Sequence, residues 1–364
     1  MFGKTIKIGS IGGIPIAVDA SWFLLAALIV WTQFAGLSDA LGGGTAFGIG
    51  VLTAALFLGS ILGHELAHAG MARLRKLPVT GIRLFMFGGA TGVQMEEKPG
   101  DEFLTTVVGP LTSVAIGFAL LGASTVAGLS APLHDTLRSV GGLNIFLGIA
   151  NLVPGFPLDG GRILHAAIWR FTGDERKATS IAARSGMVVW ALAIVAGVYL
   201  VGRNQLQAGI WLALIGTMMF QGAKATLDRD RILQALARGT VAEAMGPPPE
   251  SIPQDITLTE ALDRYLRGHE HETFPVENEG GDIVGVLTFD LAAQVGQENP
   301  LRPVRDAMQP ATGILEVGLD DPLDRVVNRL TTARLPAVVV QDGHIVGQIA
   351  IPDVDRWLRG RRVR

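Results

Sequence analysis

The sequence contains no cysteine, and only 17% of its 364 residues are charged. Without cysteine there are no disulfides, thiolate metal sites or cysteine nucleophiles, so a metal could be bound only by His, Asp, Glu or neutral oxygen ligands. With 30 basic against 33 acidic residues, the net charge of −3 gives no compositional support for nucleic-acid binding. A hydrophobic content of 49% excludes a disordered chain.

The few charges are unevenly distributed. Residues 224–364 hold 38 of the 63 charged side chains, which leaves 25 for the 223 residues before them. Windows free of Asp, Glu, Lys, Arg and His occupy 20–38, 40–63, 103–133, 139–158, 185–202 and 204–223. Each is close to the ~20 residues that a membrane-spanning helix needs. The pattern predicts a polytopic α-helical protein of the cell membrane, with six transmembrane helices in a lipid bilayer.

The basic residues between these windows predict the orientation of the chain. Lys and Arg gather before the first window, after the second, between the fourth and fifth, and after the sixth, whereas the opposite loops contain only Arg138 and Arg203. Because cytoplasmic loops carry an excess of Lys and Arg, both termini are expected in the cytoplasm.

Two segments near the predicted helices are typical of strands. Thr5–Val18 precedes the first window, and Val79–Met95 combines alternating apolar residues with the pair Gly88-Gly89. The second segment predicts a β-hairpin beside the bilayer, where irregular backbone needs protein or water around it. The alternative is a plain cytoplasmic loop.

The C-terminal part contains a repeat. Val241-Ala-Glu-Ala-Met245 matches Val304-Arg-Asp-Ala-Met308 at a period of 63 residues, and helix-like and strand-like segments follow each copy. Two copies predict two similar α/β units packed against each other. The expected organisation is a membrane domain over 1–226, a charged linker helix over 227–239, and repeats over 240–300 and 301–364.

The second window ends in His64-Glu65-Leu-Ala-His68. On a helix, residues i and i+4 lie on one face, so both imidazoles can reach one zinc ion, and Glu65 can contact its bound water as a general base. Ionisable groups in a membrane helix cost roughly 2.5–3.5 kcal/mol each and need a reason. The alternative is that they pair locally at a water-exposed helix end.

A third ligand is expected at the cytoplasmic side of the fourth window. Asp159 lies in Asn151-Leu-Val-Pro-Gly-Phe-Pro-Leu-Asp159-Gly-Gly161, where two prolines break the helix and let the carboxylate point inward. An Asp that merely caps the following helix is the alternative. His165 follows six residues later and is expected at the surface rather than at the metal.

These motifs resemble the site-2 protease family of intramembrane zinc metalloproteases (peptidase M50 type), in the branch with paired cystathionine-β-synthase (CBS) domains. The resemblance implies that His64, His68 and Asp159 bind Zn²⁺ and that Glu65 activates a zinc-bound water. It implies that Asn151, and with it Asn144, bonds the scissile carbonyl or its oxyanion. Asn144 could instead only bond a neighbouring helix. The implied substrate is a transmembrane segment of a single-pass membrane protein, cut in regulated intramembrane proteolysis.

The same resemblance makes the repeats a CBS pair, a module that binds adenine nucleotides such as ATP or AMP. Thr288 and Asp290 of the first repeat and Asp353 of the second are the implied binding residues. They depart from the Gly-x-x-Thr/Ser-x-x-Asp pattern, because one residue separates Thr288 from Asp290 and Ala350 replaces the second hydroxyl. The alternative is a docking module that makes a homodimer without a ligand.

Two other classes of function compete with the protease. A transporter or channel gated by the CBS pair would use the same ionisable residues as an ion path, and zinc content would distinguish it. A non-catalytic adaptor with a vestigial site is the second alternative, and the intact Glu65 argues against it.

Overall fold

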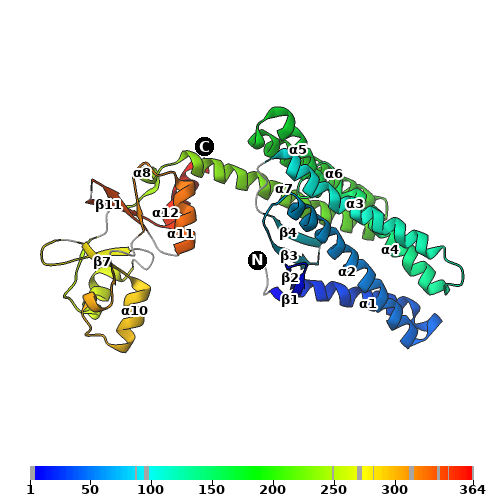
Figure 1. Ribbon diagram of the computed structural model, residues 1–364, viewed down its shortest axis with the longest axis horizontal. Coiled ribbons are helices and arrows are strands. Elements are labelled where there is room, and N and C mark those ends of the chain that lie inside the picture. Colours follow the sequence, from blue (N-terminus) through cyan, green and yellow to red (C-terminus); the bar gives the residue numbers. More distant parts are fainter. Residues whose placement is uncertain are drawn as a thin grey trace. The chain divides into compact units, whose positions relative to one another are not determined.

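The computed structural model describes residues 5–86, 88–93, 98–247, 250–268, 273–281, 283–310, 315–333, 337–342 and 344–362. The last two residues of the predicted hairpin, 94 and 95, lie outside these ranges. The chain divides into two compact units, Met1–Asp228 and Arg229–Arg364 (Figure 1).

The first unit is built mainly of helices. They are α1 (Ala20–Leu41), α2 (Gly43–Leu74), α3 (Pro99–Ser124), α4 (Ala131–Asn151), α5 (Asp159–Thr172), α6 (Glu175–Gly202) and α7 (Leu206–Arg238). Among the described residues, α1, α2, α3, α6 and α7 are long and apolar enough to cross a membrane, as in a multi-pass membrane protein. Asp19 fixes where the first of them begins, because its carboxylate accepts a hydrogen bond from the Ser21 backbone N–H.

The fourth predicted span differs from the structure. Helix α4 begins before the apolar window and carries His134, Asp135 and Arg138 near its start, so it is not among these five helices. The end of the window, 152–158, forms a loop that leads into α5. Proline cannot continue a helix, and this loop contains Pro154 and Pro157.

A mixed sheet packs on α2. Strands β1 (Thr5–Ile11), β2 (Ile14–Asp19), β3 (Val79–Phe85) and β4 (Gly88–Val93) are hydrogen-bonded in that order. Strands β1 and β2 are antiparallel, as are β3 and β4, while β2 and β3 are parallel. Ile16 of β2 and Ile82 of β3 pack against Ala69 of α2 in one buried cluster. The sheet therefore covers the part of α2 that contains the His-Glu motif.

Helix α7 continues from its apolar part through the segment predicted as a separate linker helix, since no proline interrupts residues 206–238. The second unit then alternates short helices and strands. They are α8 (Val241–Ala244), β5 (Ile252–Pro253), α9 (Leu258–Ala261), the π-helical turn Leu262–Leu266, β6 (Thr273–Glu277), β7 (Ile283–Thr288), α10 (Phe289–Glu298), the 3₁₀ turn Val304–Asp306, β8 (Gln309–Pro310), β9 (Glu316–Val317), α11 (Leu323–Ala333), β10 (Ala337–Gln341), β11 (His344–Ile349) and α12 (Ile351–Arg362).

The two repeats exchange their first segments. Val241 lies in the core of the second repeat, where it packs with Val339. Val304 correspondingly lies in the core of the first repeat with Val276. The sheets follow the same exchange, because β8 pairs with β7 of the first repeat. Each half therefore needs the other to complete its hydrophobic core.

Candidate metal centre and catalytic site

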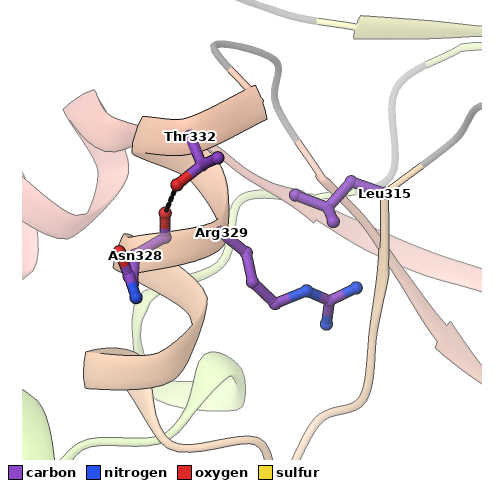
Figure 2. Close-up of a pocket in the computed structure, with 4 residues that line it drawn as sticks. All are labelled: Leu315, Asn328, Arg329 and Thr332. Carbon is purple, nitrogen blue, oxygen red and sulfur yellow. Dashed lines mark hydrogen bonds between the residues drawn. The ribbon is translucent and has the colours of Figure 1, made fainter.

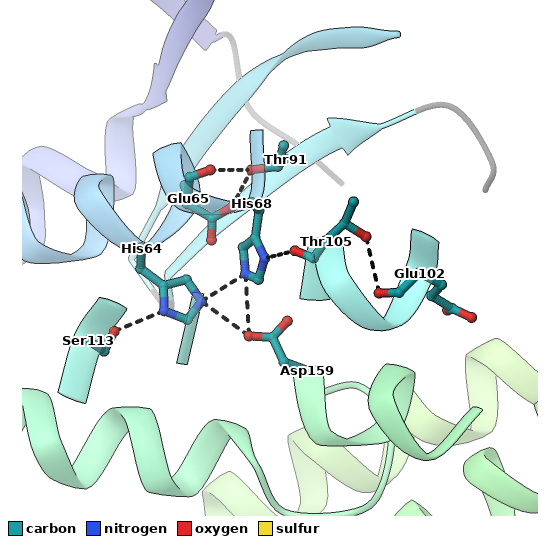
Figure 3. A network of polar contacts seen from close by, with 8 residues as sticks. All are labelled: His64, Glu65, His68, Thr91, Glu102, Thr105, Ser113 and Asp159. Atoms are coloured by element: carbon teal, nitrogen blue, oxygen red, sulfur yellow. Dashed lines mark hydrogen bonds and ion pairs between the residues drawn. The ribbon is translucent and has the colours of Figure 1, made fainter. Parts of the chain in front are cut away.

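The His-Glu motif lies in the second half of α2 and is buried. His64, Glu65 and His68 are 8%, 6% and 8% exposed. Three buried ionisable groups in so apolar a helix require partners, because an unpaired buried charge is costly. The structure supplies them from α3, β4 and α5 (Figure 3).

Asp159 is the first residue of α5, directly after the proline-containing loop. A Cβ at Gly160 would stand 2.2 Å from the Val153 carbonyl oxygen, so this loop folds back onto the start of α5 more closely than any side chain allows. The glycine that follows Asp159 thus lets the loop place the carboxylate near the two histidines.

The three residues meet through one atom each. The Nε2 atoms of His64 and His68 are 3.1 Å apart, and Oδ2 of Asp159 lies 3.1 Å from the first and 3.4 Å from the second (Figure 3). Burial raises the pKa of the Asp159 carboxyl, but hydrogen bonds and charge from the two imidazoles lower it more, so the net pKa lies well below its ordinary value.

Two groups of α3 hold the imidazole rings. The Thr105 carbonyl oxygen lies 2.7 Å from His68 Nδ1, and because a carbonyl only accepts, Nδ1 carries a proton. The neutral form of this ring would present its Nε2 lone pair to a metal. The Ser113 hydroxyl lies 2.9 Å from His64 Nδ1. The spacing of the motif on α2 does not predict these partners, since they lie 37 and 49 residues away in sequence.

Glu65 is held from the other side, by β4. The Thr91 hydroxyl donates a 2.6 Å hydrogen bond to Oε2 of Glu65. A Cβ at Gly89 would stand 2.4 Å from the Glu65 Cγ, so only glycine leaves room for this side chain. The pair Gly88-Gly89 therefore has a second role beyond forming a hairpin: it admits the carboxylate of α2.

Gly109 of α3 lies beside the histidine ring atoms. A Cβ there would stand 2.2 Å from Nε2 of His68 and 2.8 Å from Nε2 of His64. These are the atoms that would bind a metal, so the space for an ion is kept by the missing side chain at position 109.

The arrangement fits zinc. Zn–N and Zn–O bonds are about 2.0–2.1 Å long, which places neighbouring ligands of a tetrahedral ion about 3.3 Å apart. The three ligand-atom separations here, 3.1, 3.1 and 3.4 Å, match that spacing. Among the described residues, His64, His68 and Asp159 form the group of ligand atoms close enough to share an ion. Three protein ligands leave a fourth position for water or substrate.

The asparagines lie on α4. Asn144 is 2% exposed, and its amide nitrogen donates a 2.9 Å hydrogen bond to the Val140 carbonyl of its own helix. Asn151 is the half-buried last residue of α4, at the start of the loop to Asp159.

The expectation that His165 lies at the surface is wrong. It is only 6% exposed, and its Nδ1 lies 2.6 Å from Oε2 of Glu102 in α3. His165 lies on the buried face of α5 with Gly161 and Ala166, whereas Phe171 of the same helix is exposed.

The predicted nucleotide-binding residues occupy helix starts. The Thr288 hydroxyl accepts from the Leu291 N–H at the start of α10, and Asp290 is exposed in the first turn of that helix. Asp353 accepts from the Ala350 N–H at the start of α12 and forms an ion pair with Arg356. The two hydrogen bonds from backbone N–H groups, to Thr288 and to Asp353, are helix-capping interactions.

A separate groove lies along α11. It is lined by Leu315, Asn328, Arg329 and Thr332, and the Thr332 hydroxyl donates to the Asn328 carbonyl within the helix (Figure 2). It contains none of the three predicted nucleotide-binding residues.

Comparison with known proteins gives the following matches. The family model described as peptidase family M50 matches residues 126–193, and the CBS domain model matches 241–290. The protein Rip3 of Mycobacterium tuberculosis is 32% identical, over 97% of this chain and 92% of its own length. A Synechocystis protein is 30% identical, over 98% and 96%. Both carry names of zinc metalloproteases.

The chain is also similar to solved structures, and one of the matches lies in the first unit's family. The site-2 protease from Methanocaldococcus jannaschii is 28% identical, with a TM-score of 0.44, and the match covers 62% of this chain and 95% of that one.

Proposed function

We propose that this chain, which belongs to the site-2 protease family of M50 zinc metalloproteases and carries C-terminal CBS domains, is an intramembrane endopeptidase. Its substrates would be single-pass membrane proteins, cut in or near their transmembrane segments. The observation that carries the proposal is that one ligand atom each of His64, His68 and Asp159 lie within 4.8 Å of one another. Glu65 lies on the same turn of α2 as the two histidines.

In this proposal His64, His68 and Asp159 hold Zn²⁺. Bound there, zinc lowers the pKa of water to about 7 and polarises a carbonyl oxygen. Thr91 holds Oε2 of Glu65, so Oε1 is the atom that takes the proton from the attacking water. Glu65 then returns this proton to the amide nitrogen of the leaving strand. Asn151, with Asn144, would donate hydrogen bonds to the scissile carbonyl.

The substrate is proposed to bind as a strand. A transmembrane helix has its amides in internal hydrogen bonds, so it must unwind locally before it is cut. Strand β4 is at the edge of its sheet and contacts Glu65 through Thr91, and an unwound segment could add to that edge. Unchanged cleavage by Gly88→Pro and Gly89→Pro variants would exclude this mode of binding.

We propose that α4 completes six membrane spans, that both termini are cytoplasmic, and that the β3–β4 hairpin lies beside the bilayer. The excess of Lys and Arg in the loops that would face the cytoplasm supports this orientation. A reporter enzyme that is active only in the cytoplasm should be active when it is fused to the C-terminus.

The CBS pair is proposed to bind an adenine nucleotide through Thr288, Asp290 and Asp353, to make a homodimer, and to tune cleavage. Thr288 and Asp353 would have to exchange their capping contacts for nucleotide contacts. A titration with ATP or AMP that shows no saturable binding would favour the docking module instead.

Membrane proteomics of cells that carry wild type or Glu65→Gln tests the activity. We expect at least one membrane protein to accumulate uncut in the variant; if none does, the protease assignment is wrong. Zinc analysis separates the protease from a CBS-gated transporter. The protease holds about one zinc per chain and loses it on His64→Ala or Asp159→Ala, whereas the transporter would not.

A further inference from the structure

A second cluster of buried ionisable groups lies beside the metal centre. Glu102 of α3 and His165 of α5 are 7% and 6% exposed, and Oε2 of the glutamate lies 2.6 Å from Nδ1 of the histidine. On the other side of the ring, Nε2 lies 3.0 Å from the Thr179 hydroxyl of α6. None of these three residues belongs to the zinc ligands or to the proposed proton transfer.

The contacts of His165 favour its charged form. Thr179 donates its own hydrogen to the Glu175 carbonyl, so its oxygen accepts from His165 Nε2. Opposite an ionised carboxylate, which only accepts, both ring nitrogens donate and the ring is an imidazolium. Burial lowers the pKa of His165, but the effects of Glu102 and, more weakly, of Glu175 together raise it by more. The net pKa is therefore above its ordinary value. Arg162 adds a second cation 3.6 Å from Glu102.

This ion pair joins two helices that each position a metal ligand. Three residues after Glu102, the Thr105 carbonyl orients His68. Six residues before His165, Asp159 begins α5. The hydroxyl of Thr105 donates to the carbonyls of Asp101, at 2.8 Å, and Glu102, at 3.1 Å, in the preceding turn of α3. The relative placement of α3 and α5 therefore decides whether Asp159 reaches the two histidines.

We propose that Glu102 and His165 are positioning residues of the metal centre, whose ion pair docks α5 on α3 so that Asp159 completes the ligand set. A buried ion pair is often no more stabilising than an apolar pair of the same size, so stability alone does not account for it. The inference rests on the proposed function only in taking His64, His68 and Asp159 as the metal ligands.

The test is a Co²⁺ titration of the full-length, metal-free protein in detergent, read from the visible absorption of the bound ion. Glu102→Gln and His165→Gln should each lower Co²⁺ affinity about tenfold, as expected for groups that orient metal ligands. His165→Lys, which keeps a cation opposite Glu102, should recover part of the loss. The absorption spectrum should also change in the neutral variants, because the ligand geometry changes.

Asp101→Asn is the matched control. Asp101 lies next to Glu102 in the same turn of α3, but it pairs with Arg75 after α2 rather than with α5. Its Co²⁺ affinity should stay near that of wild type. If it falls as far as in the His165→Gln variant, the effect is general loosening of α3 and the proposal is wrong.

A variant that leaves one buried charge unpaired could unfold, so the double variant Glu102→Gln/His165→Gln, which leaves none, is measured as well. A folded double variant with wild-type Co²⁺ affinity would overturn the positioning role. Failure of wild type itself to bind Co²⁺ would instead overturn the metal site and the proposed function with it.

Discussion

The Thr91 hydroxyl of β4 donates a 2.6 Å hydrogen bond to Oε2 of Glu65 on α2. This contact joins the edge strand of the sheet to the proposed catalytic base, across 26 residues of sequence. It leaves Glu65 with one oxygen fixed and one available for proton transfer. The strand to which a substrate would add is thus also the strand that holds the base.

Removal of this hydroxyl should impair turnover more than substrate binding. A hydrogen bond to a charged group contributes about 1.5–3 kcal/mol, so we expect Thr91→Val to lower kcat at least about tenfold. Thr91→Ser, which keeps the hydroxyl, should retain most activity. The measurement is cleavage of a membrane substrate in detergent, with zinc content checked in each variant. Equal kcat in the valine and serine variants would show that Thr91 does not hold the base.

Gly109→Ala should abolish metal binding, because the added methyl group would stand 2.2 Å from Nε2 of His68. Metal analysis of the purified protein should fall from about one zinc per chain to nearly none. Gly122→Ala is the control on the same helix, since a Cβ there meets nothing within 4 Å. Full zinc content in the position-109 variant would contradict the placement of the ion.

Ser113→Ala should weaken zinc binding without removing a ligand. The hydroxyl orients the His64 ring from 2.9 Å, and loss of such a partner costs about 10–100-fold in metal affinity. Competition with a chromophoric chelator measures the change. Ser124→Ala is matched to it, because that hydroxyl on α3 donates to the Leu121 carbonyl of its own helix rather than to a histidine. Similar affinities in the two variants would exclude an orienting role.

The stability that His165 contributes should depend on pH. Its pKa is raised in the folded protein by Glu102 and Glu175, with Arg162 as the nearby opposing cation, whereas an unfolded imidazole titrates near about pH 6.5. The contribution is therefore fully present below about pH 6.5 and is lost as pH rises through the raised folded-state pKa. The difference in Tm between wild type and His165→Gln should be larger near pH 6 than near pH 9. A constant difference would show that His165 does not titrate over this range.

Much of the metal site could be predicted because its signals are local. The spacing of His64 and His68 follows the helical period, and Pro154 and Pro157 predict a break just before Asp159. The expectation for His165 failed because a lone polar residue in a short helix gives no sign of buried partners, and its partners Glu102 and Thr179 lie in α3 and α6. Five of the six predicted spans coincide with helices that are long and apolar enough to cross a membrane, and α4 is not among these five because it begins with polar residues.

The CBS repeats show the same division. The period of 63 residues indicates two similar units, but the exchange of Val241 and Val304 between their cores involves contacts with no local pattern. Hydrophobic periodicity records which face of an element is buried, and it does not record which element covers that face.

The amino-acid sequence by itself determined the absence of thiolates, the placement of His64, Glu65 and His68 on one helix, and the division into an apolar part and a more highly charged part. The tertiary structure alone decided which groups orient those residues: Thr105 and Ser113 behind the rings, Thr91 beside Glu65, and Glu102 opposite His165. The physical reason is range. Helix period and chain breaks act over a few residues, whereas the partners that satisfy a buried polar group come from wherever packing brings them.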